Sequence, residues 1–166
     1  MTVRLREALE DDRDFVRAIE NEPAGNVMSN VRPRSDEAFR AHWDRVMRSP
    51  TVVTRMIEYS DEGVWQTTGF VTSFVTDVEV AGEASARRCI GYRLGERWWG
   101  LGIATSALRA FLADVMAERP LWALAAAGNG PSLRVLTKCG FEVVEKRWSP
   151  ETERYPAGDE IVVVIR

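Results

Sequence analysis

The stretch Arg97-Trp98-Trp99-Gly100-Leu101-Gly102-Ile103-Ala104-Thr105 joins two segments of different periodicity. The apolar run before it, residues 89–94, is typical of a β-strand. The residues after it repeat apolar side chains at three- and four-residue steps as far as Met116, which predicts a helix. The first turn of a helix has free N–H groups and the positive end of the helix dipole, and glycines let a ligand come close to the backbone. The stretch therefore predicts a strand–loop–helix junction that binds phosphate or pyrophosphate.

Two common phosphate-binding loops do not fit this junction. A P-loop ends in Gly-Lys-Ser/Thr, and no lysine follows Gly100 or Gly102. A dinucleotide-binding fingerprint needs a third glycine and an acidic residue about 20 residues further on. Here Thr105 takes the third glycine position, and the apolar segment Trp122–Leu124 stands where the acid is required. A third pattern, Arg/Gln-x-x-Gly-x-Gly/Ala, fits Arg97–Gly102.

A second motif lies one helix and one strand further along the chain. Residues 129–141 read Asn-Gly-Pro-Ser-Leu-Arg-Val-Leu-Thr-Lys-Cys-Gly-Phe and fit the pattern N-x-x-S-x-x-[VL]-x-x-K-x-G-F. Together the two motifs resemble the GNAT superfamily of acetyl-CoA-dependent N-acetyltransferases, most closely over residues 89–148. The tryptophan before Gly100, the N-x-x-S form and the opening Val3–Arg6 resemble its RimJ/RimL-like branch, which acetylates protein N-termini and small amines.

The resemblance implies that acetyl-CoA is the cofactor and that main-chain groups hold most of it. Its pyrophosphate is expected on the N–H groups of the loop and the following helix, and its pantetheine arm beside the preceding strand. The expected cofactor-binding residues are Tyr92, Arg93, Leu94, Arg97, Gly100, Leu101, Gly102, Ile103, Ala104, Thr105 and Asn129. For two of these residues a purely structural role is an alternative to cofactor binding. Arg97 can be a surface ion-pair residue, and Asn129 can be a turn residue.

The catalytic groups are less clearly marked. Many members of the superfamily carry a tyrosine one residue beyond the [VL] position as the acid for the leaving thiolate, and Leu136 stands there in this chain. The resemblance to the RimJ/RimL-like branch makes Ser132 the substitute, although a serine at a helix start is otherwise a capping residue. No base is identified. His42, Asp77 and Glu79 are candidates, and a packed or solvated role is favoured for each.

The acceptor is expected to be a primary amine, either a protein N-terminus or a small molecule. A protein α-amine has a pKa of ~7.7–8 and is partly neutral at physiological pH, whereas a lysine at ~10.4 needs more help from a base. Cys139 lies at a helix C-terminus, where the dipole raises the pKa of a thiol. Direct transfer between two bound substrates is therefore expected, without an acetylated cysteine.

Periodicity and turn residues place the remaining elements in the order βααβββαβαββ, which indicates a mixed α/β sheet with helices on both faces. The resemblance adds that the sheet is mostly antiparallel, has seven strands and splays between the fourth and the fifth, where the cofactor enters. The expected strands are 3–9, 52–59, 64–75, 89–94, 121–127, 141–148 and 161–165. The expected helices are 10–20, 35–48, one from residue 103 that Pro120 stops, and one from Pro131 up to Gly140. Three segments are expected to line the acceptor side. Residues 21–34 are predicted as a loop that can include a helical turn, residues 76–88 as strand ends plus an irregular connection, and residues 149–160 as a charged loop.

Composition limits the classes of partner. A chain of 166 residues with 45% hydrophobic and 28% charged residues suits one globular domain, residues 1–166. The net charge of −3 gives no reason to expect nucleic acid or a membrane as a partner. The N-terminus lacks the pattern of a signal peptide, and Cys89 and Cys139 read as free thiols, so a cytoplasmic enzyme, monomeric or homodimeric, is expected. The cysteines lack zinc-site spacing and His42 is the only histidine, so no metal is expected.

Two other functions stay open on the sequence. The first is a GNAT-fold module that binds an acyl-CoA without transferring the acyl group, because the usual tyrosine is missing and Ser106 stands where relatives often carry glutamate. The second is a structural domain that associates through exposed tryptophans.

Overall fold

One seven-stranded sheet runs through the computed structural model, which describes residues 2–166. The strand order is β1-β2-β3-β4-β5-β7-β6, and every neighbouring pair is antiparallel except β4 and β5. The strands are β1 (Thr2–Glu7), β2 (Val53–Asp61), β3 (Val64–Val80), β4 (Glu83–Leu94), β5 (Leu121–Ala126), β6 (Glu142–Ser149) and β7 (Gly158–Ile165). The predicted mixed, mostly antiparallel sheet is therefore confirmed.

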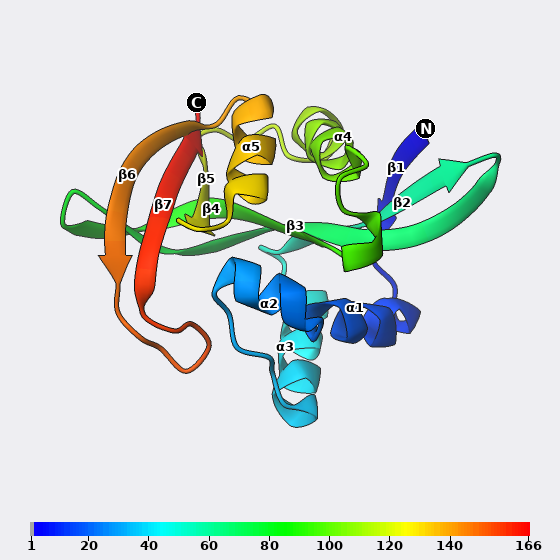
Figure 1. Ribbon diagram of the computed structural model, residues 1–166, viewed down its shortest axis with the longest axis horizontal. Coiled ribbons are helices and arrows are strands. Elements are labelled where there is room, and N and C mark those ends of the chain that lie inside the picture. The colour runs from blue at the N-terminus through cyan, green and yellow to red at the C-terminus, as the bar shows by residue number, and fades with distance from the viewer. Residues whose placement is uncertain (1) are drawn as a thin grey trace.

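The helices cover both faces of this sheet (Figure 1). One face carries α1 (Arg13–Glu20), α2 (Pro23–Ser29) and α3 (Asp36–Arg48), and the other carries α4 (Ile103–Ala110) and α5 (Gly130–Lys138). Short helical turns precede α1 (η1, Glu10–Asp12) and α4 (η2, Glu96–Trp98), and a π-helical turn continues α4 (η3, Phe111–Val115).

Residues next to the helix termini account for where α3 begins and where α5 ends. The Ser35 hydroxyl accepts from the Ala38 N–H at the start of α3, and Gly140 takes a φ of 93° after α5.

The parallel contact between β4 and β5 is very short. Only Cys89 and Trp122 stand opposite each other in register. Beyond Cys89, β4 keeps its pairing with β3 as far as Leu94, whereas β5 pairs with β7. The edge of β4 that faces β5 is therefore unpaired from residue 90 onward, and the two strands splay as expected.

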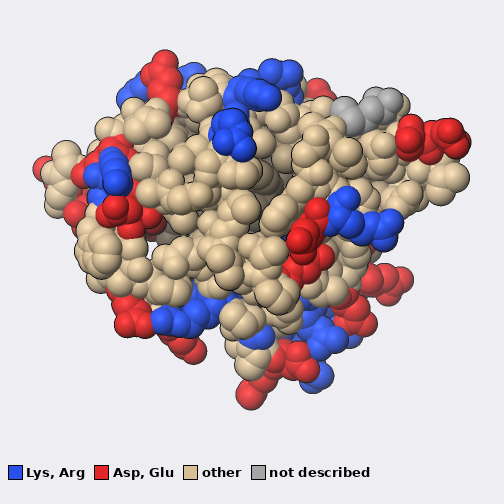
Figure 2. Space-filling model, viewed as in Figure 1, with Lys and Arg blue, Asp and Glu red and all other residues tan. Residues whose placement is uncertain are grey.

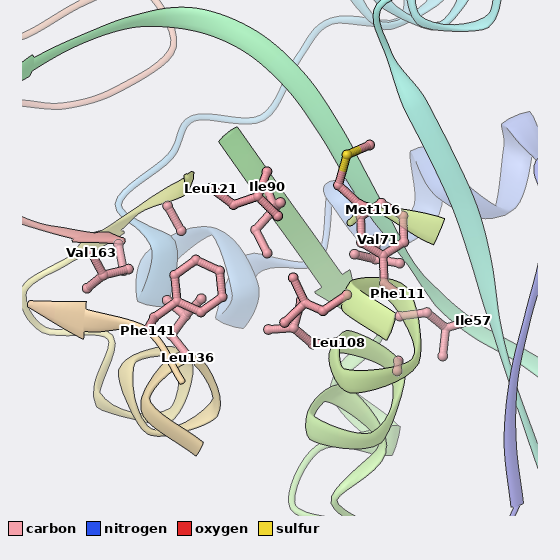
Figure 3. Close-up of a cluster of buried hydrophobic side chains, with 14 of the residues drawn as sticks. Ile57, Val71, Ile90, Leu108, Phe111, Met116, Leu121, Leu136, Phe141 and Val163 are labelled. Atoms are coloured by element: carbon pink, nitrogen blue, oxygen red, sulfur yellow. The ribbon is translucent and has the colours of Figure 1, made fainter. Parts of the chain in front are cut away.

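The larger core lies between the sheet and the pair α4–α5. Figure 3 shows Leu108 and Phe111 on the α4 side and Leu136 and Phe141 around α5, together with side chains of the central strands. Phe111 is 0% and Leu136 2% exposed. This packing fixes where α4 and α5 begin relative to β4 and β5, and both helix starts line the cleft described below.

A second core holds α1 and α3 on the opposite face. Val16, Phe39, Trp43 and Met56 are buried together there. Met56 and its neighbour Ile57 are both 0% exposed but belong to different cores, because successive side chains of a strand point to opposite faces.

The prediction of strand ends plus an irregular connection over residues 76–88 is wrong in part, because no irregular connection is present. Strands β3 and β4 continue through it as an antiparallel arm that turns at Ala81 and Gly82. Both turn residues have positive φ, 53° and 81°, the backbone form that suits a two-residue hairpin. The arm tip is held from outside the hairpin, since the Ala81 N–H donates to Glu145 and the Arg147 guanidinium donates to the Glu79 carbonyl. These contacts lie far apart in sequence and give no local signal.

The prediction of a loop that can include a helical turn over residues 21–34 is also wrong in part. Residues Pro23–Ser29 form the helix α2, with proline in its first turn and Asn30 ending it at a φ of 50°.

No helix among residues 2–166 has both the length and the apolar character that crossing a membrane requires.

Two glycines of the sheet provide a matched test of the packing. A Cβ on Gly69 would lie 2.0 Å from the Arg93 carbonyl oxygen, whereas a Cβ on Gly91 would meet Phe74 at an ordinary 3.7 Å. We expect Gly69→Ala to lower the free energy of unfolding by at least about 1–3 kcal/mol, because backbone must move. Gly91→Ala should change it by less than about 1 kcal/mol. Chemical denaturation measures both, and equal losses would contradict the register described here.

Candidate active site

The loop between β4 and α4 presents main-chain donors at the start of a buried helix. Gly100 and Gly102 both have a φ of 77°, which favours glycine. Nothing lies within 4 Å of where a Cβ on Gly100 would be, so the loop is open on that side. The Ser106 N–H closes the first helical turn on the Gly102 carbonyl, which leaves the donors of Ile103, Ala104 and Thr105 in the free first turn.

A cleft of about 650 Å³ opens at this loop and runs between the splayed strands. We call it the α5-side cleft. Most of the predicted site residues line it, and they come from β4, the start of α4 and the start of α5. These lining residues are Tyr92, Arg93, Leu94, Gly100, Gly102, Ile103, Ala104, Thr105, Asn129 and Ser132. Figure 2 shows basic side chains gathered at the edge of the molecule over α4 and α5, above a mostly uncharged centre.

Arg97 and Leu101 are the two predicted cofactor-binding residues that do not line the cleft. The Arg97 guanidinium lies over the Trp98 ring, 4.6 Å from its centroid, and Leu101 is 48% exposed. Trp98 packs against the core, and the Trp99 indole N–H donates to the Leu94 carbonyl at 3.0 Å.

Arg93 contributes its backbone to the cleft while its side chain is used elsewhere. Its guanidinium group donates to the carbonyls of Ile19 and Glu22 and to Asn26 Oδ1, at 3.1, 3.3 and 2.9 Å. It therefore fixes the junction of α1 and α2 against β4. Gly25 has no room for a side chain beside this guanidinium, since a Cβ there would lie 2.4 Å from Nη2.

The start of α5 brings three polar side chains together. Asn129 Oδ1 accepts from the Ser132 N–H at 3.2 Å and thereby caps the helix. The φ of Asn129 is −85°, so the positive φ that would explain it as a turn residue is not present. The Tyr92 hydroxyl reaches across from β4 and lies 2.8 Å from Ser132 Oγ and 3.1 Å from the Ser132 carbonyl oxygen.

A larger cavity of about 830 Å³ lies on the face covered by α1–α3, and we call it the α3-side cavity. Apolar and hydroxyl side chains of the sheet form its base, including Phe70, Thr72 and Phe74 of β3. Each of the three segments predicted to line the acceptor side contributes to its wall. The two spaces meet at the gap between β4 and β5, where they share lining residues such as Ile90, Gly91 and Leu124.

The connection between α2 and α3 and the connection between β6 and β7 close one side of the α3-side cavity, where they are hydrogen-bonded to each other. The Arg32 N–H donates to the Arg154 carbonyl at 2.8 Å, and Asn30 Nδ2 donates to the Pro156 carbonyl at 2.9 Å. Arg154 also donates to the Arg32 carbonyl and lies 3.9 Å from Glu20, a buried carboxylate where the two spaces meet. The connection between β6 and β7 is thus tied to the connection between α2 and α3.

The candidate bases occupy different positions. His42 lines the α3-side cavity, but Arg45 lies 3.2 Å from its Nδ1 and can only donate, so that nitrogen is an occupied acceptor. Asp77 also lines the cavity, at its exposed end. Glu79 does not line it. His42 and Asp77 therefore both line this cavity, and of the two only His42 has a cationic side chain as a hydrogen-bond partner among residues 2–166.

Sequence reasoning missed the side chain of Tyr92 and the carboxylate of Glu20. The alternation of residues 89–94 does place the Tyr92 side chain on one face of its strand, but the contact with Ser132 joins residues 40 positions apart. Glu20 ends an amphipathic helix, and nothing in the sequence marks this acid as buried.

The electrostatic setting of His42 gives a pH prediction. Burial, followed by the positive charges of Arg34, Arg45 and Arg154, lowers the pKa of His42 to about 4. The pKa of a histidine in the unfolded chain is ~6.5, so the unfolded chain takes up a proton on His42 at a higher pH than the folded protein does. The free energy of unfolding therefore falls as the pH is lowered from about 6.5 through 4. His42 is the only histidine, so its single NMR resonance reports the titration directly. The variant His42→Gln should lose less stability than wild type over this pH range. A midpoint near 6.5 in the NMR titration of folded wild type would contradict the burial of His42.

Comparison with known proteins agrees with this geometry. Residues 2–142 match the acetyltransferase (GNAT) domain family. A search of curated proteins finds no matching relative. Among solved structures, spermidine N-acetyltransferase from Vibrio cholerae, in complex with CoA and spermine, has a TM-score of 0.74 at 13% identity, covering 98% of this chain and 94% of that one.

Two further structures share the fold. The aminoglycoside acetyltransferase AAC(6')-Ib, in complex with coenzyme A, has a TM-score of 0.73 at 17% identity and covers 99% of this chain and 94% of its own. RimJ from Mycobacterium smegmatis, in complex with CoA-disulfide, has a TM-score of 0.71 at 20% identity and covers 98% and 81%. At these identities the structures establish the fold, while the family match extends over most of the sequence. The chain belongs to the GNAT acetyltransferase family.

Proposed function

We infer that this protein is an acetyl-CoA-dependent N-acetyltransferase that transfers the acetyl group directly to a primary amine. One observation carries the proposal: the α5-side cleft and the α3-side cavity meet at the unpaired edge of β4. Two substrates that enter these spaces can react at their junction without leaving the protein. The chain acts as one catalytic domain over residues 1–166.

The α5-side cleft has the donors that an acyl-CoA requires. The first turn of α4 offers main-chain N–H groups to a diphosphate, each favourable contact of an anion with a helix start contributing ~0.3–1 kcal/mol. The open side of Gly100 gives the phosphates access. The free edge of β4 at Tyr92 and Arg93 can pair with the amides of the pantetheine arm. An N–H on this edge that points at the thioester oxygen would stabilise charge developing there.

The α3-side cavity is the proposed acceptor site. Its base carries hydroxyls, among them Thr54 and Thr72, whose oxygens lie 2.9 Å apart. Asp77 supplies a carboxylate near its exposed end. A small polyamine, an amino sugar or a protein N-terminus all present an amine of suitable size. The RimJ/RimL-like features of the sequence favour the N-terminus or a small amine over a lysine side chain, because an α-amine is partly neutral without a strong base.

Ser132 is the proposed donor to the departing thiolate. It lines the α5-side cleft at the first turn of α5, and Leu136 brings no hydroxyl to the usual position one turn later. The role is tested by thiol release with a screen of N-terminal peptides, polyamines and amino-sugar antibiotics. We expect release with at least one class of amine, and a loss of about tenfold or more in Ser132→Ala, as found when one donor to a developing charge is removed elsewhere.

A second function is favoured by Leu136 and by the occupied nitrogen of His42. Without a general acid in the usual place or a free histidine, the fold can serve as an acyl-CoA-binding module. The two functions differ in one observable result, since the module binds acetyl-CoA but releases no thiol with any amine of the screen.

Cofactor binding itself gives a further prediction. At a hundred times its Kd, acetyl-CoA should stabilise the folded protein by ~2.7 kcal/mol, seen as a rise in Tm. Gly102→Val should weaken this binding about tenfold or more, because a β-branched side chain is strained at a φ of 77° and crowds the phosphates. Gly63→Val is the matched control, since Gly63 has a φ of 88° in a distant hairpin turn. Both variants lose some stability, and only Gly102→Val loses the cofactor. No shift at millimolar acetyl-CoA would exclude the enzyme and the module alike.

Direct transfer predicts that Cys139 is dispensable. Burial is the first cause that raises the pKa of its thiol, which disfavours the thiolate that would attack a thioester. We expect Cys139→Ala to keep the thiol-release rate within about twofold of wild type. Mass spectrometry after incubation with acetyl-CoA alone should find no acetyl group on Cys139, and finding one would replace direct transfer by a two-step mechanism.

A further inference from the structure

The hydroxyl of Tyr92 is aimed at Ser132 from the neighbouring strand. Its oxygen lies 2.8 Å from Ser132 Oγ and 3.1 Å from the Ser132 carbonyl oxygen. Both residues line the α5-side cleft, and Ser132 Oγ has no other hydrogen-bond partner among residues 2–166. Leu136, which is 2% exposed, places only methyl groups where a hydroxyl is usual in this superfamily. The Tyr92–Ser132 pair is therefore the available hydroxyl contact at the start of α5.

Tyr92 stays a hydrogen-bond donor over the whole physiological range. Burial raises its pKa to about 12, so the phenol remains protonated. A phenol has one proton, which it can give either to the carbonyl oxygen or to Oγ of Ser132. The two arrangements differ only in the rotation of light hydroxyl hydrogens, and they leave every heavy atom in place.

The two arrangements have opposite consequences for the cleft. When Tyr92 donates to the Ser132 carbonyl, Ser132 can donate to the tyrosine oxygen, and its proton points away from the cleft. When Tyr92 donates to Ser132 Oγ, the serine proton is free to turn toward a sulfur in the cleft. A hydroxyl that accepts one hydrogen bond also becomes a better donor in the next, because hydrogen bonds in a chain polarise one another. An anionic sulfur selects the second arrangement, since hydrogen bonds to charged groups are the stronger ones.

We propose that Tyr92 is a positioning residue for Ser132, donating to Ser132 Oγ so that the serine hydroxyl donates to the coenzyme A thiolate. The proposal rests on the proposed function of the α5-side cleft. It assigns the Tyr92 side chain a part in the reaction that is separate from the main-chain contact expected of the same residue. The serine touches the sulfur, and the tyrosine acts only through the serine.

Bound coenzyme A tests the proposal without any acceptor. The ultraviolet absorbance of the thiolate, followed against pH, gives the pKa of the sulfur in the complex. A donor to the thiolate lowers that pKa, so Tyr92→Phe and Ser132→Ala should each raise it relative to wild type by about one unit, a tenfold change. The double variant should raise it no further than Ser132→Ala alone, because the tyrosine works through the serine. Tyr59→Phe is the matched control, since Tyr59 lies on β2 away from both cavities, and it should leave the wild-type value.

The same measurements distinguish the ways in which the proposal fails. If coenzyme A binds to wild type and Tyr92→Phe keeps the wild-type pKa of the sulfur, the tyrosine has no such role. If the effects of the two single variants add in the double variant, Tyr92 acts independently of Ser132, which also overturns the proposal. If coenzyme A does not bind to wild type, the proposed function itself fails. Should Tyr92→Phe not fold, 3-fluorotyrosine at position 92 keeps the hydroxyl and makes it a stronger donor, and the pKa of the sulfur should then fall below the wild-type value.

Turnover adds a second readout once an accepted amine is known. Tyr92→Phe should lower kcat about tenfold with little change in the KM for acetyl-CoA, and Ser132→Thr, which keeps a hydroxyl, should retain more activity than Ser132→Ala. A purely structural effect of Tyr92 would instead change KM and Tm together and would not depend on which residue stands at position 132.

Discussion

The single parallel contact between Cys89 and Trp122 is the constraint on which the site depends. It keeps β4 and β5 in one sheet and lets them separate immediately beyond. The contact is held by its surroundings, because Trp122 packs with Val78 and Val162, and the Arg87 guanidinium lies 4.1 Å from the centroid of its ring. The hairpin arm of β3 and β4 supplies Val78 and Arg87, so this part of the chain fixes the closed end of the gap. At the open end of the gap, the α5-side cleft and the α3-side cavity meet.

The two strand–helix junctions that line the α5-side cleft could be predicted from the sequence because their signals are local. The glycines at 100 and 102, the apolar repeat of α4 and the proline and asparagine at the start of α5 each act within one turn of the residue that shows them. The family resemblance then related the two junctions to each other. Contacts of this kind need no knowledge of the tertiary structure.

The rest of the site could not be predicted because it depends on contacts between distant segments. The tip of the arm over residues 76–88 is hydrogen-bonded to Glu145 and Arg147, and its turn uses Ala81 at a positive φ, which is an unusual choice for that position. The α2 helix is held by Arg93, whose charge near the end of β4 gives no hint of its partners. The partner of Ser132 is found only when β4 and α5 are placed side by side.

The two spaces on opposite faces of the sheet are built by different parts of the chain. The main-chain donors proposed to bind the phosphates come from α4, while the walls of the α3-side cavity come largely from α1–α3 and the loop before β7. Nine residues line both spaces: Glu20, Ser29, Phe70, Ile90, Gly91, Leu124, Ala125, Ala126 and Tyr155. Under the proposed function, mutations confined to residues that line only one of the two spaces would leave the contacts of the other substrate in place, and a protein of this design could change what it modifies over evolutionary time while it keeps the same source of acetyl groups.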